Sequence, residues 1–155
     1  MPITGELGHA QLARWQPLLR LADWDIDLRL VTTEWRKSGD IKVDLDDRKA
    51  ILLLKADMPA EDLEETVVHE LVHLRLYALD QMLEGLLTAV FGSDEGEPRR
   101  AFAETEFMTL LESTTEDVTK ALLAAAGRAE PLSFERLRPE VERELGVNPG
   151  EADSN

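Results

Sequence analysis

Two of the chain's three histidines lie four residues apart, in the segment His69-Glu70-Leu71-Val72-His73. On an α-helix such residues share one face, with Cβ atoms about 5–6 Å apart, so both imidazoles can bind one Zn²⁺. Glu70 lies about 100° around the helix from His69, where it can reach a metal-bound water instead of the metal. A carboxylate in that place is suited to act as general base. The spacing predicts a zinc site for hydrolysis, and the competing interpretation is two ordinary histidines in an accidental or decayed pattern.

This site requires a helix, and the periodicity of the surrounding sequence predicts one directly after a small sheet. Apolar residues alternate in 24–31 and 41–47, and 49–57 is a more fully apolar strand. Because the three strands are consecutive, we expect a mostly antiparallel meander. The remaining apolar repeats are close to 3.6 residues and predict helices at 9–24, 59–78, 81–91, 98–126 and 133–145. The expected class is α+β, with helices packed on the sheet.

Length and composition limit the kind of protein this is. The 155 residues predict one domain over 1–145, followed by a flexible tail at 146–155. The absence of cysteine excludes disulfides and thiolate metal sites. A net charge of −15 disfavours nucleic acid and anionic membranes as partners. No secretory signal or membrane-spanning run is found, so we expect a cytoplasmic protein. The sequence does not indicate an oligomeric state.

The motif and its context resemble the zincin metallopeptidases. The residues around the histidines fit the extended family pattern at Thr66, Val67, Leu71, Val72 and Leu74, whereas Arg75 occupies a usually apolar position. A meander before the active-site helix also resembles the small zincin core, over about residues 24–126. The resemblance implies a zinc metallopeptidase whose edge strand pairs with an extended peptide or protein substrate, here 49–57 or a neighbouring strand. The overall shape is similar to compact single-domain bacterial and phage zincins.

The zincins divide by their third zinc ligand. No histidine follows His73, so the chain most resembles the gluzincin-like proteins, in which the ligand is a downstream acid. On the long helix, Glu104 is in line with apolar positions, and we expect Glu106, Glu112 and Glu116 to face solvent. Glu104 is therefore the favoured ligand, with Glu112 as the alternative. In the alternative interpretation, Glu104 binds no metal and only interacts favourably with the positive, N-terminal end of its helix.

Two further residues follow the motif on the same helix. Tyr77 lies four residues beyond His73, where it could donate a hydrogen bond to an oxyanion or simply pack. Asp80 could hold a ligand imidazole by its second nitrogen, or cap the next helix.

The predicted function is zinc-dependent hydrolysis of a peptide bond, with Glu70 as the catalytic base. Two alternatives stay open. One is a binding or assembly protein that keeps the fold without activity, and the other is a hydrolase of a non-peptide amide. The presence of Glu70 favours chemistry, since a purely structural metal site has no use for this carboxylate.

Overall fold

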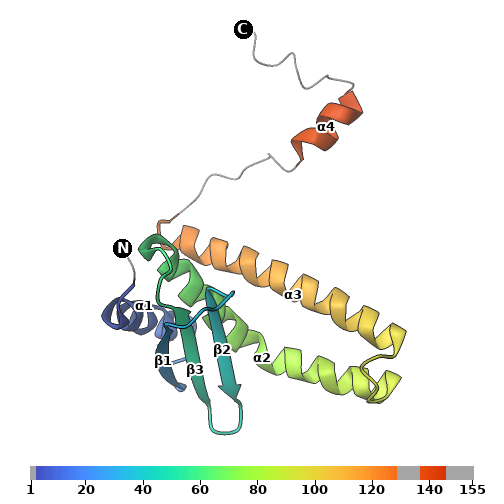
Figure 1. Cartoon of the computed structure of the whole chain (residues 1–155), viewed down its shortest axis with the longest axis horizontal. Coiled ribbons are helices and arrows are strands. Elements are labelled where there is room, and N and C mark those ends of the chain that lie inside the picture. The colour runs from blue at the N-terminus through green and yellow to red at the C-terminus, as the bar shows by residue number, and fades with distance from the viewer. Residues whose placement is uncertain (1–2, 129–136, 146–155) are drawn as a thin grey trace.

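The computed structural model describes residues 3–128 and 137–145. It confirms the predicted α+β class (Figure 1). The elements are α1 (Gly5–Leu18), β1 (Asp25–Val31), β2 (Gly39–Asp44), β3 (Lys49–Lys55), a 3-10 turn (Ala60–Asp62), α2 (Leu63–Phe91), α3 (Pro98–Ala125) and α4 (Arg138–Leu145). The tail predicted at 146–155, and the predicted start of the last helix at 133–136, lie outside the described residues.

The sheet has the strand order β1-β3-β2, so the predicted meander is wrong. The central strand β3 pairs in parallel with β1 and antiparallel with β2. The central position goes to β3, which is the most apolar of the three strands. Its Leu52 and Leu54 are fully buried, and Ile51 and Leu53 are half-buried on the other face. The strands that alternate apolar and charged residues stay at the edges, where one side meets water.

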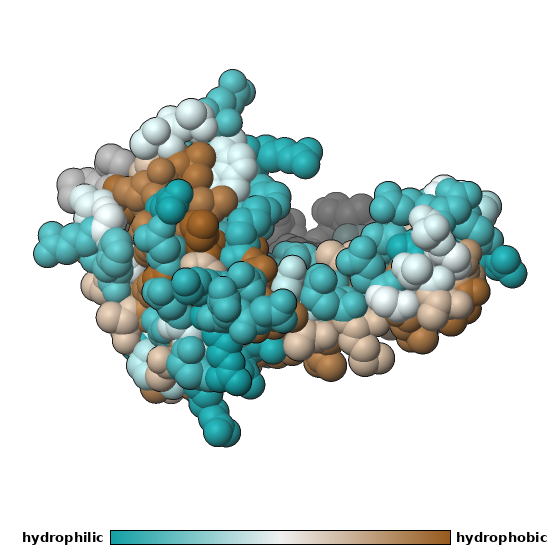
Figure 2. Space-filling model, turned by 90° about the horizontal axis from the view of Figure 1, so that it is seen from below, coloured by the Kyte–Doolittle hydropathy of each residue, from teal (hydrophilic) through white to brown (hydrophobic). Residues whose placement is uncertain are grey.

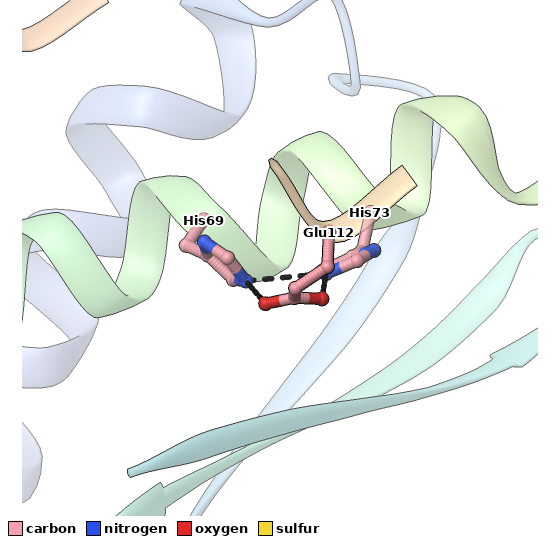
Figure 3. A group of neighbouring side chains, drawn as sticks. All are labelled: His69, His73 and Glu112. Carbon is pink, nitrogen blue, oxygen red and sulfur yellow. Dashed lines mark hydrogen bonds and ion pairs between the residues drawn. The ribbon is translucent and has the colours of Figure 1, made fainter. Parts of the chain in front are cut away.

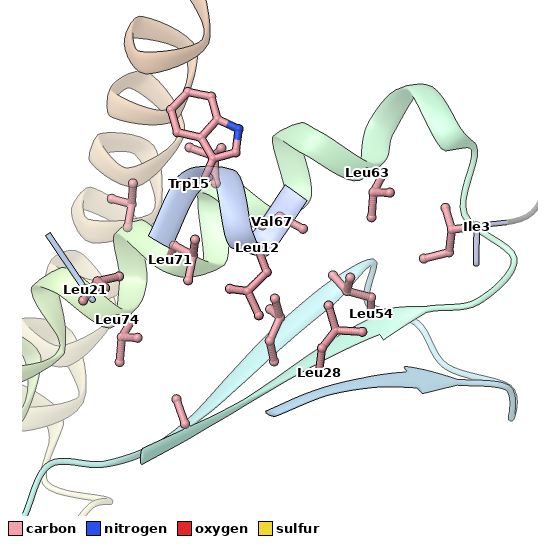
Figure 4. Packing of buried hydrophobic residues seen from close by; sticks show 14 of the residues in the cluster. Ile3, Leu12, Trp15, Leu21, Leu28, Leu54, Leu63, Val67, Leu71 and Leu74 are labelled. Carbon is pink, nitrogen blue, oxygen red and sulfur yellow. The ribbon is translucent and has the colours of Figure 1, made fainter. Parts of the chain in front are cut away.

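Helices α1 and α2 pack on one face of this sheet and enclose the core (Figure 4). From the helices, Trp15, Val67 and Leu71 are buried almost completely, and burial of each such side chain contributes about 1.5–3 kcal/mol. Gly8 allows α1 to approach closely, since a Cβ there would lie 3.0 Å from a methyl group of Leu28. The core thus fixes α2, the helix that carries the histidine pair, directly against the sheet.

The first helix, α1, begins and ends earlier than the predicted 9–24. It begins at Gly5, with the Thr4 hydroxyl accepting a hydrogen bond from the Leu7 amide, and it ends at Leu18. Pro17 lies in its last turn, and Arg20 has a positive φ of 57°, which breaks the helical path.

The segments predicted as helices 59–78 and 81–91 form one continuous helix, α2, which ends where Gly92 adopts a φ of 84°. A short loop leads into α3, and the two helices form an antiparallel hairpin whose far half projects beyond the sheet (Figure 1). Buried Arg100 ties the far end together by donating to the Thr88 hydroxyl and to the carbonyl of Gly92. The helix predicted at 98–126 is confirmed to within one residue, because α3 runs from Pro98 to Ala125.

Exposed hydrophobic side chains occur along the projecting hairpin, which extends to the right in Figure 2. On α2 they are Leu79, Met82, Leu86 and Val90. Among the described residues, no helix combines the length and the apolar character that crossing a membrane requires.

A buried carboxylate links three parts of the fold. Glu64, at the start of α2, accepts hydrogen bonds from Arg14 Nη1 at 2.8 Å, Trp15 Nε1 at 2.9 Å and Arg128 Nη1 at 2.8 Å. Burial alone would raise the pKa of Glu64, but the bonds from Arg128 and Trp15 and the charge of Arg14 outweigh it and lower the pKa. Glu64 therefore stays ionised in the folded protein at neutral pH.

We expect Glu64→Gln to lower the free energy of unfolding by about 2 kcal/mol at pH 7, since its two arginine partners are partly exposed and screened. A lowered folded-state pKa means that this stabilisation is complete above the ordinary value of 4.5 and is lost as pH falls through the folded value. Urea unfolding of the wild type and of the variant should therefore converge as pH falls below the folded-state pKa of Glu64, which lies below 4.5. Exposed Glu106→Gln is the control. A constant difference between Glu64→Gln and wild type down to pH 3 would contradict this role.

Candidate metal centre

The two imidazoles of α2 and a carboxylate of α3 converge on one point (Figure 3). The Nε2 atoms of His69 and His73 are 3.1 Å apart. Glu112 Oε1 lies 3.1 Å from His69 Nε2, and Glu112 Oε2 lies 3.2 Å from His73 Nε2. Within the described chain these are the residues whose ligand atoms lie close enough together to hold a metal ion.

This arrangement fits a zinc ion. Tetrahedral zinc with bonds of about 2.0–2.1 Å separates its ligand atoms by about 3.3 Å, close to the spacing of the two imidazole nitrogens and the carboxylate. Burial and the neighbouring His69 lower the pKa of His73, so its ring is neutral at pH 7, as a ligand must be. Two imidazoles and one carboxylate are a typical set for catalytic zinc, although the same donors also suit other divalent transition metals.

The predicted third ligand, Glu104, is not part of this group. It is exposed on α3, eight residues before Glu112, which is about 12 Å along the helix axis. The expectation that Glu112 and Glu116 face solvent holds only in part: the Glu112 side chain is 63% exposed, but both carboxylates turn toward His69 and contact it.

The unbroken length of α2 explains this correction. The contacts set the level: Glu112 lies opposite His69 and His73, and Glu116 contacts His69. Glu104 lies eight residues closer to the hairpin loop, about 12 Å along the axis from this level. The face of α3 that is buried at this level presents Thr115, Thr119 and Leu123, not an apolar stripe alone. An apolar periodicity therefore pointed to a position about two turns closer to the hairpin loop than the carboxylate that lies beside the histidines.

Glu116 is a residue that the sequence reasoning missed. Its Oε2 lies 3.4 Å from His69 Nδ1, and its Oε1 lies 2.9 Å from Lys120 Nζ. A carboxylate at Nδ1 favours the tautomer in which Nδ1 carries the proton, which leaves the Nε2 lone pair for a metal. The available signal was the spacing itself: Glu112 and Glu116 repeat on α3 the four-residue spacing of the histidines on α2.

Glu70 lies beside the three converging side chains. It is only 8% exposed, and its carboxylate makes no hydrogen bond or ion pair with other described residues. Burial, followed by the negative charges of Asp40 and Glu112, raises the pKa of Glu70 to about 7. A buried carboxyl group of this kind has the basicity that proton transfer near neutral pH requires.

These groups open into a cleft of about 690 Å³ between α2, α3 and the edge strand β2. Gly39, Asp40 and Ile41 form the strand side of the cleft. The segment 49–57 cannot offer a free edge, because β3 is paired on both sides. Of the two edge strands, β2 is the one that lines the cleft. Tyr77 is half-buried and lines the cleft one turn beyond the histidines.

Asp80 also lines the cleft, but neither role expected from the sequence is seen. Helix α2 continues through it, so it is not a cap. No hydrogen bond joins Asp80 to His73 among the described residues, and the imidazole partner found instead is Glu116.

Close packing of β2 against α2 holds Glu70 in place. A Cβ added to Gly39 would lie 2.7 Å from Thr66 Cγ2 and 3.0 Å from Glu70 Cγ and Oε1. We expect Gly39→Ala to displace the Glu70 side chain and to destabilise the fold by about 1–3 kcal/mol, as overpacking does. The control is Gly85→Ala, where a Cβ meets nothing within 4 Å and the helix should gain about 0.5–1 kcal/mol. Thermal unfolding checks both, and equal melting temperatures for the two variants would contradict close packing at Gly39.

Comparisons with protein-family models, curated proteins and solved structures found no match to this chain. The resemblance to zincins therefore depends on the motif and its context. What the structure adds is local: it brings His69, His73 and Glu112 together, places Glu70 and Tyr77 on the same cleft, and leaves Glu104 outside it.

Proposed function

We propose that this protein is a zinc-dependent hydrolase of peptide bonds that works in the manner of the zincins. The observation that carries the proposal is the convergence of two imidazole nitrogens and a carboxylate within about 3.2 Å, beside a buried, unpartnered glutamate. A structural zinc site is usually closed by four protein ligands and has no use for a carboxylate such as Glu70. Glu70, at the wall of an open cleft, gives the site a group that can move a proton.

Each residue has a distinct role in this proposal. His69 Nε2, His73 Nε2 and Glu112 would hold the zinc, and Glu116 would keep His69 in the right tautomer. When bound, zinc supplies a Lewis acid that acidifies water and polarises a carbonyl. The Glu70 carboxylate would take a proton from the attacking water and give it to the leaving amine nitrogen. The Tyr77 hydroxyl would donate a hydrogen bond to the carbonyl oxygen as negative charge develops there.

The strand β2 is the proposed shelf for the peptide. Its inner edge is paired with β3, and its other edge has no partner strand among the described residues. An extended peptide can add to such an edge by main-chain hydrogen bonds, which need no particular side chains. Because residues 39–41 line the cleft, a peptide in this position would pass beside Glu70.

A peptide library tests the proposal. Zinc-loaded protein should cleave a subset of peptides, chelator should stop the cleavage, and added zinc should restore it. The same samples assayed with simple non-peptide amides separate the two kinds of hydrolase. A protein that binds one zinc per chain and yet cleaves no peptide or amide would contradict the proposal and favour a binding or assembly role.

A further inference from the structure

The cleft carries acidic groups at both ends of its helical wall. Asp62 lies seven residues before His69, and Asp80 lies seven residues after His73. Seven residues are nearly two helical turns, so each acid lies on the face of its nearest histidine, about 10 Å along the axis. Both line the cleft, as does Glu65 near the first end. The proposed metal centre therefore has one carboxylate on each side at the same spacing.

These carboxylates have no protein cation to neutralise them. Asp62, Glu65 and Asp80 make no side-chain hydrogen bond or ion pair with other described residues, and Asp80 is half-buried. The strand wall differs, because Lys37 and Lys42 both pair with Asp40, at 3.2 and 2.7 Å. The acid excess of the cleft thus lies on its helical side: Asp62 directly precedes α2, Glu65 and Asp80 lie on α2, and Glu112 and Glu116 lie on α3.

A second observation points to a ligand in the same cleft. Glu70, more than nine-tenths buried, faces it without a partner of its own. Leaving a buried carboxyl group without a hydrogen bond is costly, so a bound group that reaches Glu70 would be stabilised there. A ligand that runs from Asp62 past Glu70 to Asp80 would give each of these carboxylates a hydrogen-bond or ion-pair partner.

We propose that the cleft selects extended peptides with lysine or arginine about four residues to either side of the bond next to Glu70. Asp62 and Asp80 lie eighteen residues apart, which is about 27 Å along the helical wall, and an extended chain that advances about 3.3 Å per residue covers this distance in about eight residues. A basic side chain at either position would pair with Asp62 or Asp80. This substrate class rests on the proposed function, since it assumes that a peptide lies along β2.

Binding of peptides, measured separately from cleavage, tests the proposal. The probes are fluorescent twelve-residue peptides of neutral sequence, with two lysines about eight residues apart, with two adjacent lysines, or with two glutamates about eight residues apart. Anisotropy is recorded for the full chain with zinc and with chelator. The spacing of about eight residues should bind best, and Asp62→Asn or Asp80→Asn should each weaken binding about three- to fivefold, with about tenfold for the double variant. Asp47→Asn, on the far turn between β2 and β3, is the matched control and should change nothing.

The outcomes separate this inference from the proposed function. If all lysine peptides bind alike and Asp47→Asn weakens them as much as Asp80→Asn, the net charge of the chain explains binding, and the inference is wrong. If neutral peptides are cleaved as fast as spaced-lysine peptides, hydrolysis stands and the inference fails alone. If the spaced-lysine preference depends on Asp62 and Asp80 but no zinc binds and nothing is cleaved, the proposed function fails and the basic-peptide cleft stands.

Discussion

Glu112→Ala is expected to weaken zinc binding by more than about a hundredfold, whereas Glu104→Ala should leave it unchanged. The first change removes a carboxylate that lies 3.1–3.2 Å from both imidazole nitrogens, and the second removes an exposed group outside the site. Glu116→Ala should fall between them, at about 10–100-fold, which is the usual cost of losing a group that orients a ligand. Competition with a fluorescent zinc chelator measures all three variants.

His69→Ala and His73→Ala should each abolish stoichiometric zinc binding. These two variants therefore set the lowest zinc affinity against which the glutamate variants are compared. Circular dichroism of every variant shows whether the helices remain, so that lost metal is not confused with lost fold. Impaired binding in Glu104→Ala together with normal binding in Glu112→Ala would show that the hairpin register described here is wrong.

Glu70→Gln is expected to retain zinc and fold but to lose at least about a hundredfold in the rate of peptide hydrolysis. The amide keeps the shape of the side chain but cannot take a proton from water, and general bases typically contribute 10²–10⁴-fold. The loss should appear in kcat more than in KM, because the group acts in the transition state. Glu84→Gln removes a charge from an exposed position of the same helix and should leave both constants unchanged. Equal rates for Glu70→Gln and wild type would remove this residue from the mechanism.

The histidine pair and its glutamate could be predicted from sequence because they depend on local geometry alone. Once 63–73 is helical, the spacing of His69 and His73 places them on one face, and no distant contact is needed. The class of fold was predictable for a similar reason, since the change of apolar period at residue 57 marks the change from strand to helix.

The strand order could not be read in the same way. A meander and the observed order β1-β3-β2 contain the same strands, and the choice depends on which one is buried on both faces and both edges. The run of consecutive apolar residues at 50–54, which puts apolar side chains on both faces of the strand, was the available sign that β3 is central.

The third carboxylate depended on a long-range register. The position of this carboxylate depends on how far α2 runs before the loop turns the chain back into α3. Because a break between two helices was expected near residue 80, the sequence did not show that α2 runs unbroken to Phe91, and the residues of α3 that lie opposite the histidines could not be identified. Matched spacing on the two helices would have been a better guide than apolar periodicity. Glu112 and Glu116 stand four apart, as do His69 and His73, and antiparallel helices bring such pairs face to face.

The central claim is that zinc binds between α2 and α3 with one position open to the cleft. Crystals of zinc-loaded protein, with anomalous diffraction recorded on both sides of the zinc absorption edge, test it most directly. We predict one ion per chain, about 2.0–2.1 Å from the Nε2 atoms of His69 and His73 and bound by Glu112, with its fourth position facing Glu70 and the cleft. An ion found elsewhere, or a fourth position closed by a protein side chain, would contradict the account.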